Sequence, residues 1–156
     1  MKQGSKVGIV CCSNGLSADQ AGTIEILVQI LEKAGLEAEL SPYLYGDETG
    51  RAGTARERAG ALMKFYEDDS IEEIFDVSGG DMANELLPYL DFQTIAYGKK
   101  RFWGYSDLTT ILNAIYARTG KSSVLYQVRN LTYDHSQSQI TDFLETTLAG
   151  ASSLYD

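Results

Sequence analysis

One serine lies where the chain changes from a strand pattern to a helix pattern, a position suited to a nucleophile. An apolar, aromatic run ends at Gly104, and an amphipathic helical pattern begins two residues after Ser106 (Leu108, Ile111, Leu112 and Ile115). A sharp turn there would hold the Ser106 hydroxyl clear of its own backbone, and the unpaired N–H groups of the next helix could bind a developing oxyanion. The pattern therefore predicts a nucleophile elbow. It also allows a plainer interpretation, in which Ser106 or Asp107 is only the N-cap of the helix.

A pair of glycines follows another strand pattern upstream. Residues 71–77 are typical of a buried strand. Ser78 follows this strand, and Gly79 and Gly80 come next. A glycine pair exposes backbone N–H groups, which could supply the other half of an oxyanion hole. It could equally serve only to turn the chain from strand to helix.

These two segments belong to an alternating series of strands and helices. Strands are predicted at residues 6–11, 36–40, 71–77, from Arg101 to the elbow, and from Ser123. Helices are predicted at 17–34, before residue 71, after the glycine pair, after the elbow, and at about 139–148, with a loop at 41–53. This order predicts an α/β fold, flavodoxin-like or Rossmann-like, with a parallel sheet covered by helices on both faces. In such folds ligands bind at the carboxyl ends of the strands, where Ser13, Gly79, Gly80 and Ser106 should emerge.

Several motifs, taken in order, resemble the LD-carboxypeptidase family of serine peptidases, which includes the branch that confers self-immunity to microcin C. They are Val7–Val10 with Ser13, Arg58–Asp68, Gly79-Gly80, the segment 86–92 (LLPYLDF), and the segment 104–109 (GYSDLT). The resemblance covers nearly the whole chain. The wording of segment 78–84 (SGGDMAN) is more similar to the microcin-immunity branch than to the murein-recycling branch.

The resemblance implies a role for individual residues. Ser106 matches the nucleophile, and the N–H of Asp107 together with an N–H at Gly79 or Gly80 matches the oxyanion hole. The substrate would be a small peptide, such as a murein L,D-tetrapeptide, or an aminoacyl-nucleotide. We expect further residues to line the substrate site: Ser13, Ser78, Asp81 and Asn84.

The family completes its catalytic triad with a glutamate and a histidine from a C-terminal domain. We expect residues 1–156 to be the nucleophile-bearing N-terminal domain without that second domain. The chain has one histidine, His135, which lies in a polar stretch and could act as a base only if it approached Ser106, with Asp134 orienting it. A surface that meets the missing domain, or a second copy of the chain, should expose aromatic side chains such as Tyr43, Tyr45 and Tyr133.

Composition excludes several classes of protein. The net charge of −9 argues against nucleic acid and anionic membrane surfaces as partners, and the 44% apolar content is ordinary for a globular domain. The first 13 residues carry no long apolar core, so we expect no secretory signal or membrane span and a cytoplasmic location. We expect no cofactor and no metal, and we interpret the acidic run at 67–73 as a solvated helix end. The segment 150–153 has the composition of a linker.

Other interpretations remain open for the cysteines and for the function. Adjacent Cys11 and Cys12 are interpreted as small core residues, although a cysteine at a strand end could instead be a reactive thiol with a lowered pKa. The domain could be a non-catalytic binding module. It could also be an unrelated flavodoxin-like domain that holds a phosphorylated ligand at Gly79 and Gly80, although no Gly-x-Gly-x-x-Gly or Walker pattern is present.

Overall fold

The computed structural model describes residues 1–150, so most of the linker-like segment 150–153 lies outside the described residues. Five parallel strands form one sheet in the order β2-β1-β3-β4-β5. Their bounds are β1 (Lys6–Val10), β2 (Glu37–Leu40), β3 (Ile71–Asp76), β4 (Arg101–Gly104) and β5 (Val124–Leu125). This is the flavodoxin-like order, and it confirms the predicted parallel α/β fold.

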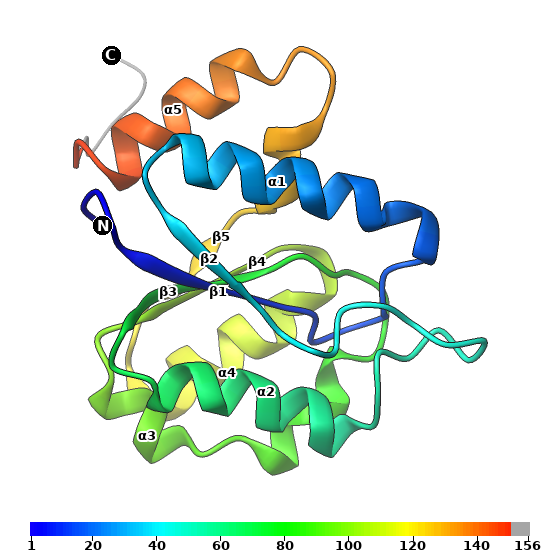
Figure 1. Ribbon diagram of the computed structural model, residues 1–156. Coiled ribbons are helices and arrows are strands. Elements are labelled where there is room, and N and C mark those ends of the chain that lie inside the picture. Colours follow the sequence, from blue (N-terminus) through cyan, green and yellow to red (C-terminus); the bar gives the residue numbers. More distant parts are fainter. Residues whose placement is uncertain (151–156) are drawn as a thin grey trace.

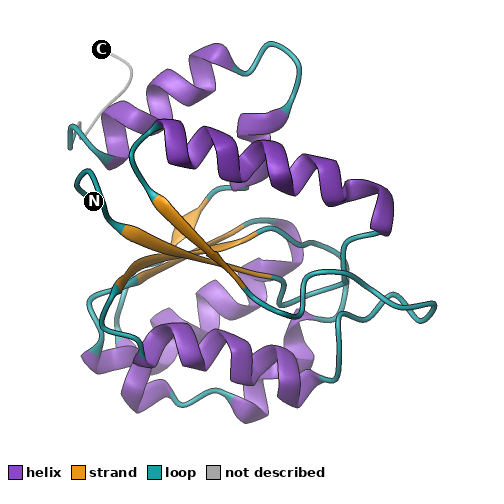
Figure 2. Cartoon of the chain, viewed as in Figure 1, coloured by secondary structure: helices purple, strands orange, loops and turns teal. Residues whose placement is uncertain are grey.

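Helices cover both faces of the sheet (Figures 1 and 2). On one face lie α1 (Ala21–Lys33) and α5 (Gln137–Thr147), and on the other lie α2 (Ala55–Glu67), α3 (Phe92–Tyr97) and α4 (Thr109–Thr119). Short 3₁₀ helices occupy the connections Ala18–Gln20 (η1), Ala83–Tyr89 (η2), Ser106–Leu108 (η3) and Val128–Thr132 (η4). None of the helices in residues 1–150 has the length and apolar character needed to cross a bilayer.

Alternating side chains of the strands build two cores, one on each face. In β1, Val7 and Ile9 join the cluster under α1 and α5, whereas Val10 joins the cluster under α2 and α4. Gly8 lies under α2, where an added Cβ would be 2.5 Å from the Phe65 ring, so only glycine permits this close packing. Burial on both faces is typical of parallel sheets and explains the apolar strand patterns.

The sheet order places the start of two loops at a topological switch point. From β1 the chain moves outward to β2 and then returns to β3 on the other side of β1, so the loops after β1 and β3 diverge. Ligands of open α/β sheets bind in the crevice that such diverging loops create at the carboxyl ends of the strands. The elbow after β4 lies beside β3 at the same edge. The fold therefore brings the three predicted loops together.

Candidate active site

Ser106 has a strained backbone conformation, as the sharp turn of a nucleophile elbow requires. Its φ is +58°, and His135 is the one other non-glycine residue with positive φ among the residues described. An L-residue in this region is uncommon and costs about 1–3 kcal/mol, so its surroundings must hold it there. Gly104 permits the sharp turn, because a Cβ on Gly104 would lie 2.7 Å from Leu108 Cβ. The Ser106 residue is exposed to solvent.

The interpretation of Ser106 or Asp107 as an N-cap is wrong. Tyr105 is the N-cap of η3 and Leu108 that of α4, and neither side chain accepts a capping hydrogen bond. The Asp107 carboxylate contacts other loops instead. Its Oδ2 accepts a hydrogen bond from Ser13 Oγ at 2.5 Å and one from the Ala83 N–H at 2.8 Å. The side chain after Ser106 thus joins the elbow to the loops that follow β1 and β3.

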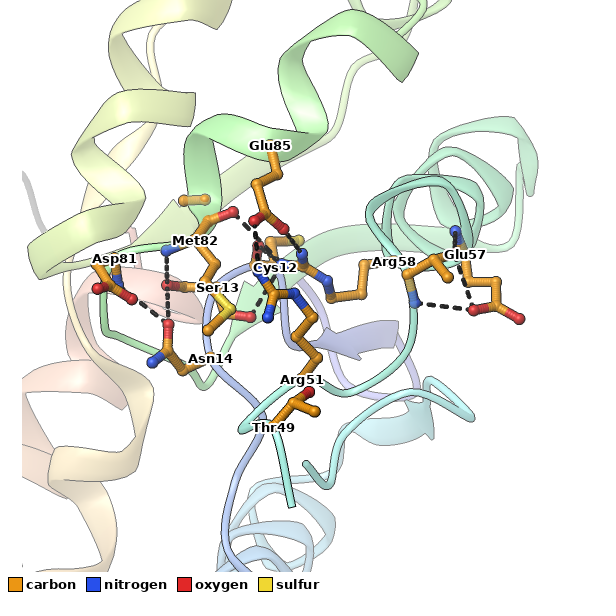
Figure 3. Close-up of polar contacts among 12 residues, drawn as sticks. Cys12, Ser13, Asn14, Thr49, Arg51, Glu57, Arg58, Asp81, Met82 and Glu85 are labelled. Atoms are coloured by element: carbon orange, nitrogen blue, oxygen red, sulfur yellow. Dashed lines mark hydrogen bonds and ion pairs between the residues drawn. The ribbon is translucent and has the colours of Figure 1, made fainter. Parts of the chain in front are cut away.

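Asn14 supports the loop after β3 that carries Gly79 and Gly80, here called the glycine loop. Nothing in the sequence indicated this role. Its N–H donates to the Gly79 carbonyl at 3.1 Å, and its Oδ1 accepts from the Asp81 N–H at 3.0 Å (Figure 3). Gly80 has a φ of +130°, and a Cβ there would lie 2.2 Å from Asn14 Cγ, whereas a Cβ on Gly79 would meet nothing within 4 Å. The conformation of this loop therefore depends on glycine at position 80.

Backbone donors at this edge are available to a ligand. Among residues 1–150, the N–H groups of Gly79, Gly80 and Asp107 have no hydrogen-bond acceptor. Free N–H groups at a turn and at the start of a helix are the donors from which oxyanion holes are built.

Asp76 connects the buried side of the two loops. Its Oδ2 accepts from the Cys12 N–H at 2.7 Å, and its Oδ1 accepts from the N–H of Ser78 at 2.7 Å and from Ser78 Oγ at 2.5 Å. Ser78 Oγ accepts in turn from the Ser13 N–H at 2.9 Å. Complete burial raises the pKa of Asp76 above its ordinary value, and these hydrogen bonds oppose that rise.

The four residues expected to line the substrate site fall into two groups. Ser13 and Ser78 are buried, and their hydroxyls are engaged inside the protein. Their hydroxyls therefore hold the loops after β1 and β3 together, and a contact of these two residues with substrate stays a prediction. Asp81 and Asn84 are exposed, and substrate contact by these two stays a prediction.

A buried arginine supports the site from α2. Arg58 is 1% exposed, and its Nη1 donates to the carbonyls of Cys12 at 2.8 Å and Ser13 at 3.0 Å. Its Nη2 pairs with Glu85 Oε2 at 2.5 Å, and Arg51 pairs with the other oxygen of Glu85 at 2.9 Å (Figure 3). Thr54 is the N-cap of α2 and forms a capping box with Glu57, so the helix begins at Ala55. Arg58 is therefore near the start of the helix.

The cysteines are core residues, and the reactive-thiol alternative is wrong. Both are buried and free of disulfides. Burial, aided by the charge of Asp76, raises the pKa of Cys11 to about 12, and the same causes raise the pKa of Cys12. A reactive cysteine requires the opposite shift.

No base is hydrogen-bonded to the Ser106 hydroxyl within residues 1–150. His135 is exposed, and no hydrogen bond within residues 1–150 joins the Ser106 hydroxyl to a histidine or a carboxylate. No cluster of three or more potential metal ligands occurs in the same part of the chain. Of the tyrosines expected on a partner surface, Tyr45 and Tyr133 are exposed, whereas Tyr43 packs partly against the core.

A cavity of about 850 Å³ opens elsewhere, at the amino ends of β3 and β4. Its wall mixes carboxylates such as Glu73 with lysines such as Lys100. The Glu73 carboxylate is already paired with Arg101 and with the Trp103 indole N–H. The free backbone donors, the positive φ of Ser106 and the engaged Asp107 all lie at the opposite edge, and we place the candidate site there.

Comparisons with known proteins show which family the chain resembles. The sequence pattern of the LD-carboxypeptidase N-terminal domain matches residues 7–126. A protein of Vibrio cholerae that is named as a carboxypeptidase is 39% identical over 93 residues, which are 56% of this chain and 28% of that protein. The microcin C7 self-immunity protein MccF of Escherichia coli is 36% identical over 93 residues, which are 60% of this chain and 27% of MccF.

Solved structures share the fold over nearly all of the chain. An MccF-like protein from Bacillus anthracis has a TM-score of 0.83 and 27% identity, covering 95% of this chain and 46% of that one. MccF in complex with aspartyl sulfamoyl adenosine has a TM-score of 0.82 and 25% identity, covering 95% of this chain and 45% of that one. The chain therefore spans less than half the length of these relatives. Because the domain pattern matches well over half of its residues, the chain belongs to the LD-carboxypeptidase family and corresponds to its N-terminal domain.

Proposed function

We propose that this chain is the nucleophile-bearing part of a serine peptidase or amidase of the LD-carboxypeptidase type. The observation that carries the proposal is the conformation of Ser106, exposed at φ +58° on a turn that the Asp107 carboxylate connects to the glycine loop. A strained, exposed serine beside free backbone N–H groups is the arrangement from which acyl-transfer sites are built. Family membership favours the same reaction.

In the proposed reaction, Ser106 Oγ attacks the carbonyl carbon of an amide and loses its proton to a base. The carbonyl oxygen becomes an oxyanion, which accepts hydrogen bonds from the N–H of Asp107 and an N–H at Gly79 or Gly80. The C–N bond then breaks, and the departing amine takes the proton from the base. Water attacks the acyl-enzyme in the second half of the reaction and restores Ser106.

The base belongs to a second domain in this proposal. Family resemblance implies a glutamate and a histidine of a C-terminal domain for the triad, and the single histidine of this chain is exposed and makes no hydrogen bond to Ser106 among the residues described. Loss of triad members costs several orders of magnitude in rate, while the oxyanion hole retains some acceleration. We therefore propose that residues 1–156 alone are nearly inactive. The partner domain, or a second copy of the chain, would cover exposed aromatic side chains such as Tyr45 and Tyr133.

We propose a small amide as substrate, either a murein L,D-tetrapeptide or an aminoacyl-nucleotide. MccF is named for immunity to microcin C7 and was solved with aspartyl sulfamoyl adenosine, and the Vibrio protein is named as a carboxypeptidase. Exposed Asp81 and Asn84, which flank the glycine loop, are the proposed substrate contacts.

A non-catalytic binding module is the second candidate, and the lack of a base hydrogen-bonded to the Ser106 hydroxyl within residues 1–150 favours it. An unrelated flavodoxin-like domain with a phosphorylated ligand is excluded by the family match. Nucleophilicity of Ser106 separates the remaining two candidates.

The test is covalent labelling of the 156-residue chain by a fluorophosphonate, followed by intact mass and peptide mapping. A nucleophile in an oxyanion hole predicts slow, stoichiometric labelling at Ser106 that Ser106→Ala abolishes. Exposed Ser138, on α5, provides the matched control, and Ser138→Ala should label like the wild type. Random labelling of several serines, or none at Ser106 after prolonged incubation, would leave the binding module as the better description.

A further inference from the structure

We propose that the carboxylate of Asp107 is a positioning residue that fixes the two halves of the oxyanion hole relative to each other. This inference rests on the proposed function, and it gives the side chain of Asp107 a role separate from that of its backbone N–H. The geometry that carries it is the double acceptance by a single oxygen, Oδ2, of hydrogen bonds from Ser13 Oγ and the Ala83 N–H.

The two halves of the proposed oxyanion hole come from different strand ends. The Asp107 N–H follows β4, whereas the Gly80 N–H follows β3. Stabilising an oxyanion requires both donors about 2.7–3.1 Å from one oxygen position, so the separation between the two loops must be held within a few tenths of an ångström. Backbone pairing of β3 with β4 stops at Phe75 and Trp103, before either loop begins. Side-chain contacts must set the remaining separation.

Asp107 makes that connection. The Ala83 N–H lies three residues after Gly80, at the start of η2, and its bond to Oδ2 joins the far end of the glycine loop to the elbow. Ser13, which is completely buried, adds the loop after β1 through its hydroxyl, and the same hydroxyl accepts from the Met82 N–H at 3.3 Å. Each movement of the glycine loop away from the elbow must break one of these bonds.

Other side chains at this edge do not replace this connection. Asn14 and Arg58 join the glycine loop and η2 to the loop after β1, and they make no hydrogen bond to the elbow residues among the residues described. Gln127, which follows β5, bonds to the Ser78 carbonyl before the two glycines, whereas Asp107 is the elbow side chain that bonds directly to the residue at the far end of the loop, Ala83. The two bonds of Asp107 to uncharged donors are charge-assisted, which makes them stronger than neutral ones.

Three variants test the role. Asp107→Ala removes both bonds. Asp107→Asn retains them, because a carboxamide oxygen in the place of Oδ2 has two lone pairs and can accept from Ser13 and Ala83 together. Asp91→Ala is the matched control, because Asp91 also accepts hydrogen bonds from backbone N–H groups, those of Gln93 and Thr94, and from a hydroxyl, that of Thr94, but at the start of α3.

The first measurement is the rate of fluorophosphonate labelling at Ser106 as a function of reagent concentration. It gives the maximal labelling rate and the reagent concentration at which the rate is half-maximal. Asp107→Ala should lower the maximal rate about 100-fold with little change in half-saturation, since misplacing one donor costs on the order of 100-fold. Asp107→Asn should recover most of the rate, and Asp91→Ala should label like the wild type. A merely structural role would instead lower the stability of Asp107→Ala and Asp91→Ala alike without changing the labelling rate of the folded protein.

The second measurement is amide hydrogen exchange at Ala83, which does not depend on Ser106 chemistry. Protection of Ala83 should fall in Asp107→Ala by at least about tenfold, because its N–H loses a charge-assisted hydrogen bond. Wild-type labelling rates in a folded Asp107→Ala that has lost this protection would overturn the positioning role alone. Absence of labelling in the wild type itself would overturn the nucleophile, and this role with it.

Discussion

Substituting the two glycines of the loop separately should give a destabilised protein in one case and a nearly unchanged one in the other. Gly80 has φ +130°, a conformation that L side chains rarely adopt, and a Cβ there would lie 2.2 Å from both Cγ and Oδ1 of Asn14. In Gly80→Ala the backbone must leave this conformation or Asn14 must move and give up its bond to the Asp81 N–H. In Gly79→Ala the new methyl group enters open space, because nothing lies within 4 Å of it.

The expected loss of stability in Gly80→Ala follows from the backbone strain and the lost hydrogen bond. Backbone strain at such a position costs about 1–3 kcal/mol, and the lost hydrogen bond adds about 1 kcal/mol. Gly80→Ala should therefore lower the free energy of unfolding by about 3 kcal/mol, equivalent to a fall in Tm of roughly 6–12 °C for a domain of this size. Gly79→Ala should change it by no more than about 0.5 kcal/mol.

Urea unfolding followed by circular dichroism measures both values, and fluorophosphonate labelling of the folded fraction measures the effect on the site. Gly80→Ala should also label Ser106 more slowly, because the loop that carries one oxyanion donor is displaced. Equal stabilities of the two variants would refute the reasoning, since it derives the whole difference from the backbone angle and the contact with Asn14.

Three further outcomes are expected. Arg58→Leu should cost about 3 kcal/mol in urea unfolding, because it leaves two buried carbonyls without their donor, whereas removing the more exposed Arg51 should cost less than about 1 kcal/mol. The hydrogen bond from Arg51, with the charges of Arg51 and Arg58, lowers the pKa of Glu85 below its ordinary 4.5, so its contribution to stability is present above that pH and is lost as the pH falls through the folded pKa. The stability difference between wild type and Glu85→Gln should accordingly shrink on acidification below about pH 4.5, and a constant difference would contradict this assignment. Finally, Cys11 and Cys12 should not react with Ellman's reagent at about pH 8 in the native protein, where their raised pKa values keep them as thiols, and both should react after unfolding.

The elements that the sequence predicted well are those with local causes. Gly104 before Ser106 and an apolar helical pattern after it require a sharp turn wherever the segment lies in the fold, and the φ of Ser106 confirms this. The parallel sheet followed from apolar strands alternating with helices. The strand predicted from Ser123 is limited to Val124 and Leu125, because Gln127 turns inward and donates to the Ser78 carbonyl.

The contacts that position the site could not be read from the sequence. Sequence order identified the loop ends that carry Ser13 and Ser78, but it could not show that both hydroxyls turn into the protein toward Asp107 and Asp76. Asn14 gave no signal, since its importance comes from a long-range approach to Gly80.

Arg58 did leave a trace in the sequence. It lies four and seven residues before Leu62 and Phe65, on the apolar face of α2, and a charged residue on such a face needs a buried partner. The partners, the carbonyls of Cys12 and Ser13 and the carboxylate of Glu85, are distant in sequence and become visible only in the fold.

The central claim is that Ser106 is a peptidase nucleophile whose base lies in a second domain. The direct measurement is release of the terminal amino acid from an L,D-linked tetrapeptide, or of aspartate from an aspartyl-nucleotide amide. It would use the 156-residue chain alone and the chain joined to the C-terminal half of MccF. We predict negligible turnover by the chain alone, turnover in the joined protein that Ser106→Ala abolishes, and no effect of His135→Ala in either. Full turnover by the chain alone that His135→Ala removes would contradict the account.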